Sequence, residues 1–389
     1  MKRKPERPLR TRPTSRGVGA VVLSALALPG VCLSPAHAQS KAEDGVVAFK
    51  YLYYQDSQPG LTRVRVLAPS IYIAAPVGSD WSVEAAIVTD SVSGATPRWQ
   101  SSISSASVMR EFRRAGDVTV TRYFERSSYS LGYSYSGEHD YVSNTVSVRG
   151  SWASEDNNTT LSAGVGASKD RINPTDGGLL GVSNERRRVA EFMVGVTQAV
   201  SSDDLAQINL VYTRGSGYYS DPYKTLDFRP SERRQLAVLA RWNHFLDGDG
   251  STLRGSYRFY RDSFGVTAGT LQGEWVKPVT QSLTLTPLLR LYSQSSASFY
   301  VDAQYDAAGF PIFPDLLPGQ LNSGDHRLSA FGAISLGLSA EYKVSNVWTI
   351  SAGVEGYEQR TSWRVGGQGS LGLDPFRAVF VQVGASHKF

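Results

Sequence analysis

The feature that most constrains this 389-residue chain is an alternation of apolar and polar side chains that recurs along most of its length. In one segment Leu161, Ala163, Val165 and Ala167 alternate with serine and glycine. Successive side chains of a β-strand point to opposite faces, so one face of such a segment suits lipid and the other suits water. Helices fit poorly, because the apolar spacing is two and a glycine in a helix interior costs about 1 kcal/mol. The alternation predicts an all-β fold, a transmembrane antiparallel β-barrel.

Sixteen strands are expected, with fourteen as the second choice. Short links rich in turn residues alternate with long ones such as 91–116, 171–186, 217–232 and 295–327. This pattern is typical of short periplasmic turns and longer outer loops, and an even strand number places both termini on the periplasmic side. The expected strands are 46–54, 62–75, 81–90, 117–125, 128–137, 141–153, 159–169, 187–200, 205–215, 233–246, 252–262, 265–277, 282–294, 328–342, 347–359 and 377–389.

Tryptophans support this orientation. Five of them fall within a few residues of an expected periplasmic turn, on the apolar face of their strands, where an interfacial aromatic girdle would lie. A soluble β-sandwich with these rings in its core is the alternative. The five are Trp81, Trp152, Trp242, Trp275 and Trp348.

The first 38 residues have the pattern of a secretory signal peptide. Seven Lys or Arg precede the apolar run 18–28, and Ala36, His37 and Ala38 supply a small-x-small cleavage site. The run is too short to span a bilayer as a helix. We expect residues 1–38 to be removed and residues 39–389 to form a single barrel domain in the cell outer membrane, beginning at Gln39.

Removal of this segment changes the charge and the cysteine content. The whole chain has 40 basic and 35 acidic residues, and residues 1–38 contain seven and one of them, so the remainder has 33 against 34, a net charge of −1. Nucleic-acid binding through phosphate neutralisation is therefore not supported. Cys32, the only cysteine, leaves with the peptide. A lipoprotein acylated at Cys32 is the alternative, although the residues before it do not form a lipobox.

The last strand carries a second targeting pattern. Its side chains alternate back from Phe389, and the spacing of Gln382, Gly384, His387 and Phe389 resembles the terminal assembly signal of bacterial outer-membrane β-barrels. Only His387 departs from it, because a larger aromatic is usual there. The resemblance implies recognition by the barrel assembly machinery.

Five sequence blocks spread over most of the chain are Asp90–Pro97, Asp140–Ser143, Asp221–Lys224, Tyr257–Phe264 and Leu289–Ser295. They resemble recurrent blocks of an uncharacterised Gram-negative family of presumed outer-membrane β-barrel proteins, with Thr96 and Ser296 as small departures. The resemblance implies a barrel in the outer membrane and supplies no activity.

Charged residues lie opposite the apolar face in many expected strands. A charge within a membrane-spanning strand must face water or a partner, and sixteen strands leave an aqueous channel. We expect a porin-like channel for passive or gated diffusion of small hydrophilic solutes. The alternative is a plugged structural or adhesive barrel whose outer loops bind a partner. The candidate lumen-lining residues are Arg63, Arg65, Glu84, Arg149, Glu191, Arg241, Arg254, Arg258, Glu274 and Arg290, together with Glu341 and Glu355.

Aspartates gather near the expected outer rim. One interpretation is a solvated rim with surface ion pairs that contribute little each. The other is contact with outer-membrane lipid, through divalent cations or lipopolysaccharide phosphates, with Arg186, Arg187 and Arg188 as the phosphate contact. The aspartates are Asp90, Asp140, Asp170, Asp221, Asp262 and Asp302, and their expected basic partners are Arg171, Lys224 and Arg261.

Motifs for catalysis and cofactors are weak. The GxGxxG match at residues 367–372 lacks the following helix and acidic residue of a dinucleotide site, and the loop at 247–251 lacks the glycine and glutamate of a calcium loop. We expect no cofactor, no metal and no enzyme. The cluster Glu138, His139 and Asp140 leaves an outer-membrane hydrolase as a remote alternative.

Overall fold

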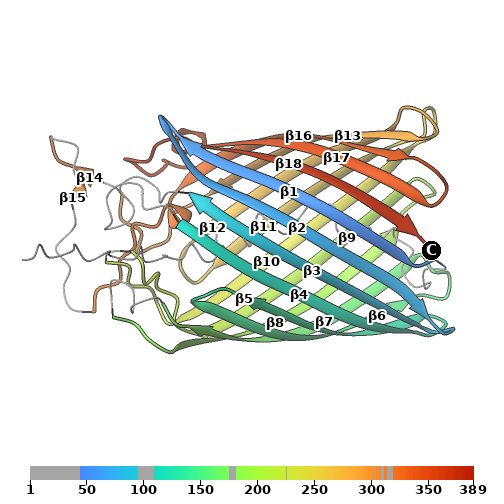
Figure 1. Ribbon diagram of the computed structural model, residues 1–389, viewed down its shortest axis with the longest axis horizontal. Coiled ribbons are helices and arrows are strands. Elements are labelled where there is room, and N and C mark those ends of the chain that lie inside the picture. The colour runs from blue at the N-terminus through green and yellow to red at the C-terminus, as the bar shows by residue number, and fades with distance from the viewer. Residues whose placement is uncertain are drawn as a thin grey trace, which may run out of the picture.

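The chain forms a closed antiparallel barrel of sixteen strands in a computed structural model that describes residues 44–94, 109–174, 181–224, 226–302, 304–307, 311–312 and 319–389 (Figure 1). The predicted all-β transmembrane barrel and its sixteen strands are confirmed. The expected signal peptide, Cys32 and Gln39 lie outside the described residues.

Each barrel strand pairs with its neighbours in sequence, and β1 pairs with β18 to close the ring. Two short strands, β14 and β15, pair with each other outside the barrel, and two 3-10 turns, η2 and η3, lie in the loops. The elements are β1 (Val46–Gln58), β2 (Leu61–Val77), β3 (Trp81–Gly94), β4 (Met109–Tyr123), β5 (Ser127–Gly137), β6 (Tyr141–Ala153), β7 (Thr159–Ile172), β8 (Glu185–Ala199), β9 (Asp204–Gly217), β10 (Glu232–Leu246), β11 (Ser251–Asp262), β12 (Thr267–Pro278), β13 (Leu283–Gln294), β14 (Gln304–Tyr305), β15 (Pro311–Ile312), η2 (His326–Leu328), β16 (Phe331–Lys343), β17 (Trp348–Arg360), η3 (Thr361–Trp363) and β18 (Phe376–Lys388).

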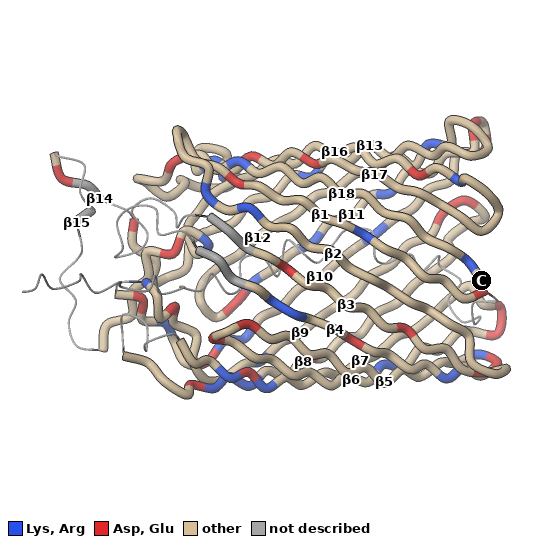
Figure 2. The backbone as a smooth tube through the Cα atoms, viewed as in Figure 1, with Lys and Arg blue, Asp and Glu red and all other residues tan. Residues whose placement is uncertain are grey.

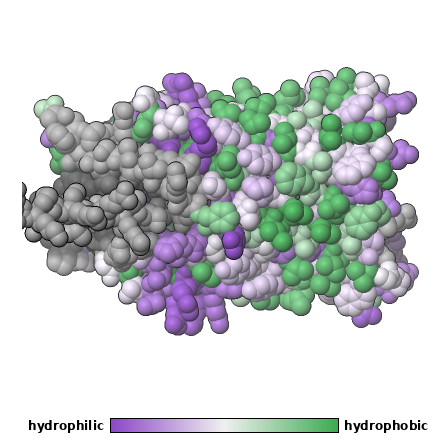
Figure 3. Space-filling model, in the orientation of Figure 1, coloured by the Kyte–Doolittle hydropathy of each residue, from purple (hydrophilic) through white to green (hydrophobic). Residues whose placement is uncertain are grey.

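The outer surface of the barrel is apolar because the strand alternation places large hydrophobic side chains there. Val165 faces Phe192 across the β7–β8 pair, and both side chains are about half exposed. Figure 3 shows apolar residues over much of the barrel wall and hydrophilic ones next to one end. Such an extended exposed apolar surface requires a partner, and a bilayer supplies it. No helix within the described part of the chain is long and apolar enough to cross a membrane.

The two ends of the barrel differ. At one end, named the turn end here, all connections between strands contain five residues or fewer, and the chain terminus lies there (Figure 1). The opposite end, named the loop end, has the long connections, including 218–231 and 295–330. The five tryptophans predicted to form a girdle are all exposed, on strands near the turn end.

The strand β4 is eight residues longer than expected at its start, because it begins at Met109 and not at residue 117. Residues 109–116 were expected in the long link 91–116. In the barrel, Arg113 lies opposite Asp90 of β3 and forms an ion pair with it at 3.5 Å, so the charge supports the strand.

The seam between β1 and β18 contains the four residues of the expected assembly signal. Gln382 pairs with Leu52 and Gly384 with Lys50, while the His387 ring lies 4.6 Å from that of Trp348. Phe389 exchanges two backbone hydrogen bonds with Gly45, at 2.9 and 3.0 Å. A Cβ at Gly45 would approach the Phe389 ring to 2.5 Å, so this glycine makes room for the ring.

Replacing Phe389 with serine is expected to lower the amount of inserted barrel several-fold. The change removes the ring that lies over Gly45 and, under the assembly hypothesis, the aromatic that the assembly machinery recognises. Heat-modifiable mobility of the membrane fraction on SDS gels measures the folded protein. Phe380→Ser, on the lumen face of the same strand, separates the terminal aromatic from a general loss of packing. Wild-type levels of folded Phe389→Ser would contradict the hypothesis.

Candidate functional site

The faces of the strands are assigned by their exposed apolar residues. In β11, Leu253 and Tyr257 are exposed on the lipid side, so Arg254 and Arg258 lie on the lumen side. The same alternation in the other strands places most of the predicted lumen residues on the lumen side. They are Glu84, Arg149, Glu191, Arg241, Arg254, Arg258, Glu274, Arg290, Glu341 and Glu355.

Arg65 is an exception, and its prediction as a lumen residue is wrong. It pairs with Gln55 and lies on the face of Ile71 and Ile73, which are exposed to lipid. The β1–β2 ladder shifts register only beyond this pair, between Gln55 and Ser57, so strict alternation from Ile71 and Ile73 already places Arg65 outside.

Arg63 faces inward because of the same register shift. Its side chain is buried, with Nε 3.7 Å from Asp56 Oδ1 and the guanidinium 4.9 Å from the centre of the Phe376 ring. Asp56 also accepts a hydrogen bond from the backbone N–H of Val64 at 3.1 Å. Arg63 is therefore a packed residue at the loop end and not a freely hydrated pore residue.

A ladder of polar contacts runs along one wall of the lumen. Arg254 lies 3.7 Å from Glu274, Gln272 donates to Glu274 at 2.7 Å, and Arg290 donates to Gln272 at 2.9 Å and to Glu355 at 3.0 Å. These contacts join β11, β12, β13 and β17. In this lumen ladder the charged side chains are paired along the barrel wall and still face the barrel interior.

The wall formed by β5, β6 and β7 is different, because its inward side chains are small. Serine and glycine dominate the face opposite the exposed Leu131 and Leu161. Side chains this short cannot fill the interior of a sixteen-stranded barrel, which is wide enough for an aqueous channel. The small inward residues include Ser130, Gly132, Ser134, Ser147, Gly164 and Gly166.

Aspartates at the loop end are buried in ion pairs that join neighbouring strands. Figure 2 shows acidic and basic residues next to one another at this end of the barrel. Asp90 lies 3.5 Å from Arg113, Asp170 2.7 Å from Arg187, and Asp262 2.5 Å from Arg233. Each carboxylate is at most 3% exposed, so the interpretation as a solvated rim is wrong for these three.

The prediction that Arg171 and Arg261 pair with these aspartates is also wrong. Alternation places both arginines on the outer face, whereas Asp170 and Asp262 form their ion pairs inside the barrel. No group of three His, Cys, Asp or Glu within the described ranges could hold a metal ion. The inner aspartates therefore fasten adjacent strands to each other through arginine.

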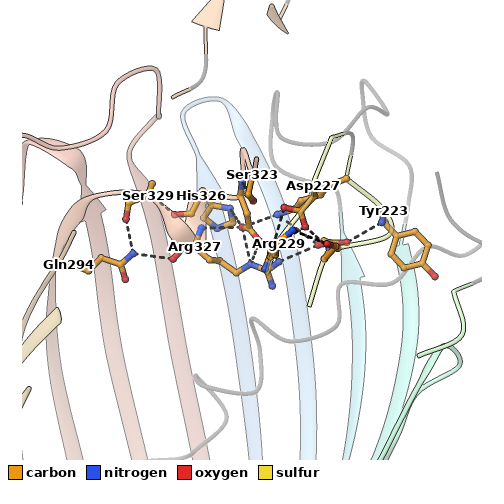
Figure 4. Close-up of polar contacts among 12 residues, drawn as sticks. Tyr223, Asp227, Arg229, Gln294, Ser323, His326, Arg327 and Ser329 are labelled. Carbon is orange, nitrogen blue, oxygen red and sulfur yellow. Dashed lines mark hydrogen bonds and ion pairs between the residues drawn. The ribbon is translucent and has the colours of Figure 1, made fainter. Parts of the chain in front are cut away.

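The largest set of buried charges among the described residues is the loop-end cluster, formed by two long loops. One loop supplies residues from 221 to 229 and the other supplies residues from 325 to 327 (Figure 4). Its members are Asp221, Lys224, Asp227, Arg229, Asp325, His326 and Arg327.

Asp325 is the centre of the loop-end cluster. Its fully buried carboxylate lies 2.8 Å from Lys224 Nζ and 2.8 Å from Arg229 Nη2, and it also pairs with Arg327. Arg229 reaches Asp227 at 2.9 Å, and Arg327 also reaches Asp221, at 3.2 Å, so the network is continuous.

The charged groups of the loop-end cluster shift one another's pKa values. Burial alone would raise the pKa of Asp325, but Arg327, Lys224 and Arg229 hold it well below its ordinary value. Burial lowers the pKa of Lys224, although Asp325 opposes this effect. Burial also lowers the pKa of His326 well below its ordinary value, with Asp325 opposing and Lys224, Arg63 and Arg327 adding to the shift. The buried position therefore favours the neutral form of the histidine.

The cluster extends as a chord across the mouth of the barrel. At one side Tyr223 Oη donates to Asp140, in the β5–β6 connection, at 2.8 Å. At the other side the His326 ring lies 6.4 Å from Phe376, the first residue of β18, which Arg63 of β2 covers. Figure 4 shows the contacts running from Gln294 and Ser329 to Tyr223, across the ends of the strands.

An apolar base supports the chord. Phe264 and Val266, from the β11–β12 connection, are buried against Ala297, Phe299 and Leu328. Gln294 donates to the backbone oxygens of 327 and 329 at 3.0 and 2.6 Å, which fixes η2 to the end of β13. Tyr219, from the loop that also supplies Asp221, packs against the same base, so the two loops form one packed body.

Sequence reasoning missed most of this cluster. Asp221 and Lys224 were among the rim candidates, but Asp227, Arg229 and Asp325 were not, because about a hundred residues separate the two loops. Asp140 was considered as part of an acid–base group; its carboxylate instead accepts the hydrogen bond of Tyr223, a structural tie.

A family model described as "Protein of unknown function (DUF3570)" matches residues 18–110 and 100–380. No curated protein matches the chain in sequence.

Solved structures with a similar arrangement include three bacterial proteins. A bacterial polysaccharide outer membrane secretin is 8% identical with a TM-score of 0.47, over 88% of this chain and 98% of that one. CdiB from Acinetobacter baumannii is 9% identical with a TM-score of 0.48, over 87% of this chain and 60% of that one. OccK2 from Pseudomonas aeruginosa is 11% identical with a TM-score of 0.44, over 89% of this chain and 98% of that one.

Proposed function

We propose that this chain, which belongs to the DUF3570 family of proteins of unknown function, is a gated outer-membrane channel for small hydrophilic solutes. The observation that carries the proposal is the combination of a lumen with charged and small polar walls and a loop-end cluster that lies across its mouth. The walls hydrate the path and the cluster restricts entry. The loop end faces outwards, and the turn end faces the periplasm.

Besides the paired charges of the lumen ladder, inward basic side chains lie on one part of the lumen wall and inward acidic ones on a distant part. Arg241, Arg254 and Arg258 lie on β10 and β11, whereas Glu84 and Asp117 lie on β3 and β4, seven strands away in the ring of sixteen. Charged walls of this kind raise the local concentration of counter-ions. The path therefore favours small hydrophilic solutes with charge or a dipole.

Replacing Arg254 and Arg258 with glutamate is expected to shift the channel towards cations. The ratio of cation to anion permeability should rise by a factor of about ten or less, because each change alters the local charge by two units within a wide lumen. The reversal potential in a salt gradient across a planar bilayer measures it. Arg261→Glu, on the outer face of the same strand, is the control and should leave the potential unchanged. An unaltered reversal potential in a conducting double variant would contradict the proposal.

Acid is expected to open the channel. His326 is neutral in the closed cluster, whereas in open loops it has an ordinary pKa of about 6.5. The closed form therefore has its full stability above about pH 6.5 and loses up to about 1.4 kcal/mol per pH unit as the pH falls towards the lowered pKa of His326. Asp325 stays ionised in this window because its pKa is held well below its ordinary value.

The measurement is open probability between about pH 7 and about pH 5, compared with His326→Gln. The wild type should open by up to about tenfold per unit and the variant should respond weakly. Equal pH responses of the two proteins would assign the effect to another group.

A plugged structural or adhesive barrel is the second candidate, and the buried charges of the loop-end cluster favour it to the extent that they fix the loops in place. The same bilayer measurement separates the two, since a permanently plugged barrel conducts under none of these conditions. The hydrolase alternative receives no support from Asp140, whose carboxylate holds Tyr223.

A further inference from the structure

Four basic side chains form a compact group on the outer face of the barrel, at the loop ends of β7 and β8. Lys169 lies directly opposite Arg188, and Arg171 directly opposite Arg186. All four are exposed. Opposed Cβ atoms of an antiparallel pair are about 5 Å apart, so four cations occupy one small patch. This group is named the basic quartet.

The two strands cannot neutralise the quartet with their own carboxylates. Asp170 lies between Lys169 and Arg171 in sequence, but it faces the lumen and pairs with Arg187 at 2.7 Å. Glu185 also faces the lumen by alternation. No described residue forms an ion pair with a member of the quartet. Like charges directly opposite each other destabilise a sheet, so this arrangement has a cost that an external anion would remove.

Other basic residues at the outer loop end differ in this respect. Arg214 lies 3.7 Å from Glu232, and Arg360 and Arg377 lie 2.5 and 3.4 Å from Glu358. Those positions are already paired within the protein. The quartet differs from these three arginines because it has no acidic partner among the described residues.

The position of the quartet identifies the source of the anion. Along the outer face of β7, Leu161, Val165 and Ala167 precede Lys169, and along β8 Ala190 and Phe192 follow Arg188. The cations thus begin where the apolar surface ends, which is the depth of lipid headgroups. The planar guanidinium group of arginine matches the geometry of phosphate and can bind it with two parallel hydrogen bonds.

We propose that the basic quartet binds the phosphate groups of lipid A, the lipid portion of lipopolysaccharide, in the outer leaflet. The inference rests on the proposed outward placement of the loop end and is independent of conduction. The two phosphate groups would be shared among the four cations, and the acyl chains would lie on the apolar surface of β7 and β8. Arg187, which the sequence grouped with its neighbours as a phosphate contact, is excluded because it is bonded to Asp170 inside the barrel.

The test measures lipid binding to the full-length mature protein in detergent by native mass spectrometry, so channel activity plays no part in the readout. The probes are bisphosphorylated lipid A, its dephosphorylated form and inorganic phosphate. The wild type should bind bisphosphorylated lipid A about tenfold or more tightly than the dephosphorylated form, with inorganic phosphate unable to displace it. Equal binding of the two lipids, or displacement by inorganic phosphate at the lipid's concentration, would overturn the proposal.

Variants then locate the site. Lys169→Gln/Arg171→Gln/Arg186→Gln/Arg188→Gln should lose this preference, and Arg171→Gln/Arg186→Gln should lose part of it, while Arg360→Gln/Arg377→Gln should keep it. Heat-modifiable mobility verifies that each variant is folded, and the double variant keeps the test valid if the quadruple variant does not fold. An unchanged preference in the folded double or quadruple variant would overturn the assignment. A failed conductance assay alongside retained lipid A preference would reject the channel and leave the lipid site standing.

Discussion

Replacing Asp325 with asparagine is expected to release the two loops and raise the conductance of the barrel. The carboxylate is fully buried and faces Lys224, Arg229 and Arg327. Removing its charge leaves three cations together without their central anion. Removing one partner of a buried ion pair destabilises a protein by about 3–5 kcal/mol, because the remaining charge is left buried without a partner. The closed arrangement should therefore become the minor state.

Single-channel recording of the refolded protein measures this change as a longer open time and a larger mean current. Glu232→Gln is the matched control, because Glu232 also pairs with an arginine at the loop end but is 61% exposed. An exposed pair contributes about 1 kcal/mol or less, so the control should behave as the wild type does. A folded Asp325→Asn barrel with wild-type current would show that the cluster does not restrict the mouth.

The barrel could be predicted from the sequence because a single physical rule governs all sixteen strands. Lipid faces require apolar side chains, and the β-strand fixes their period at two. Leu161 and Val165 expose their side chains as that rule requires. Strict alternation places Arg65 on the lipid face, so its prediction as a lumen residue did not follow the rule. The rule fails at Arg63, which the register shift in β1–β2 turns inward, and such a shift has no signature in side-chain polarity alone.

The contacts at the loop end could be predicted from alternation only in part. Asp170 pairs with Arg187 and not with its neighbour Arg171, because adjacent residues of a strand face opposite sides. Alternation alone therefore excludes Arg171 as the partner of Asp170. For Asp325 and Arg229 no local pattern was available, since their contact depends on how two loops fold over the apolar base of Phe264 and Phe299.

A reversible covalent link between the two loops tests gating directly. Phe228 and Asn322 exchange two backbone hydrogen bonds, at 2.7 and 2.9 Å, as an isolated antiparallel bridge. Their Cα atoms are then about 5.5 Å apart, which is within the range of a disulfide. Cys32, the only cysteine, lies in the segment expected to be removed, so Phe228→Cys/Asn322→Cys would add the only pair.

The decisive measurement is single-channel conductance of this double-cysteine barrel with Asp325→Asn, recorded under oxidising conditions and again after a reductant is added. The gated-channel account predicts a low current while the disulfide holds the loops together and a return to the high Asp325→Asn current on reduction. Asp325→Asn without the cysteines should not respond to the reductant. The same high current in both redox states, with the disulfide verified by mass spectrometry, would contradict gating by the loop-end cluster, and no current in either state would contradict the channel itself.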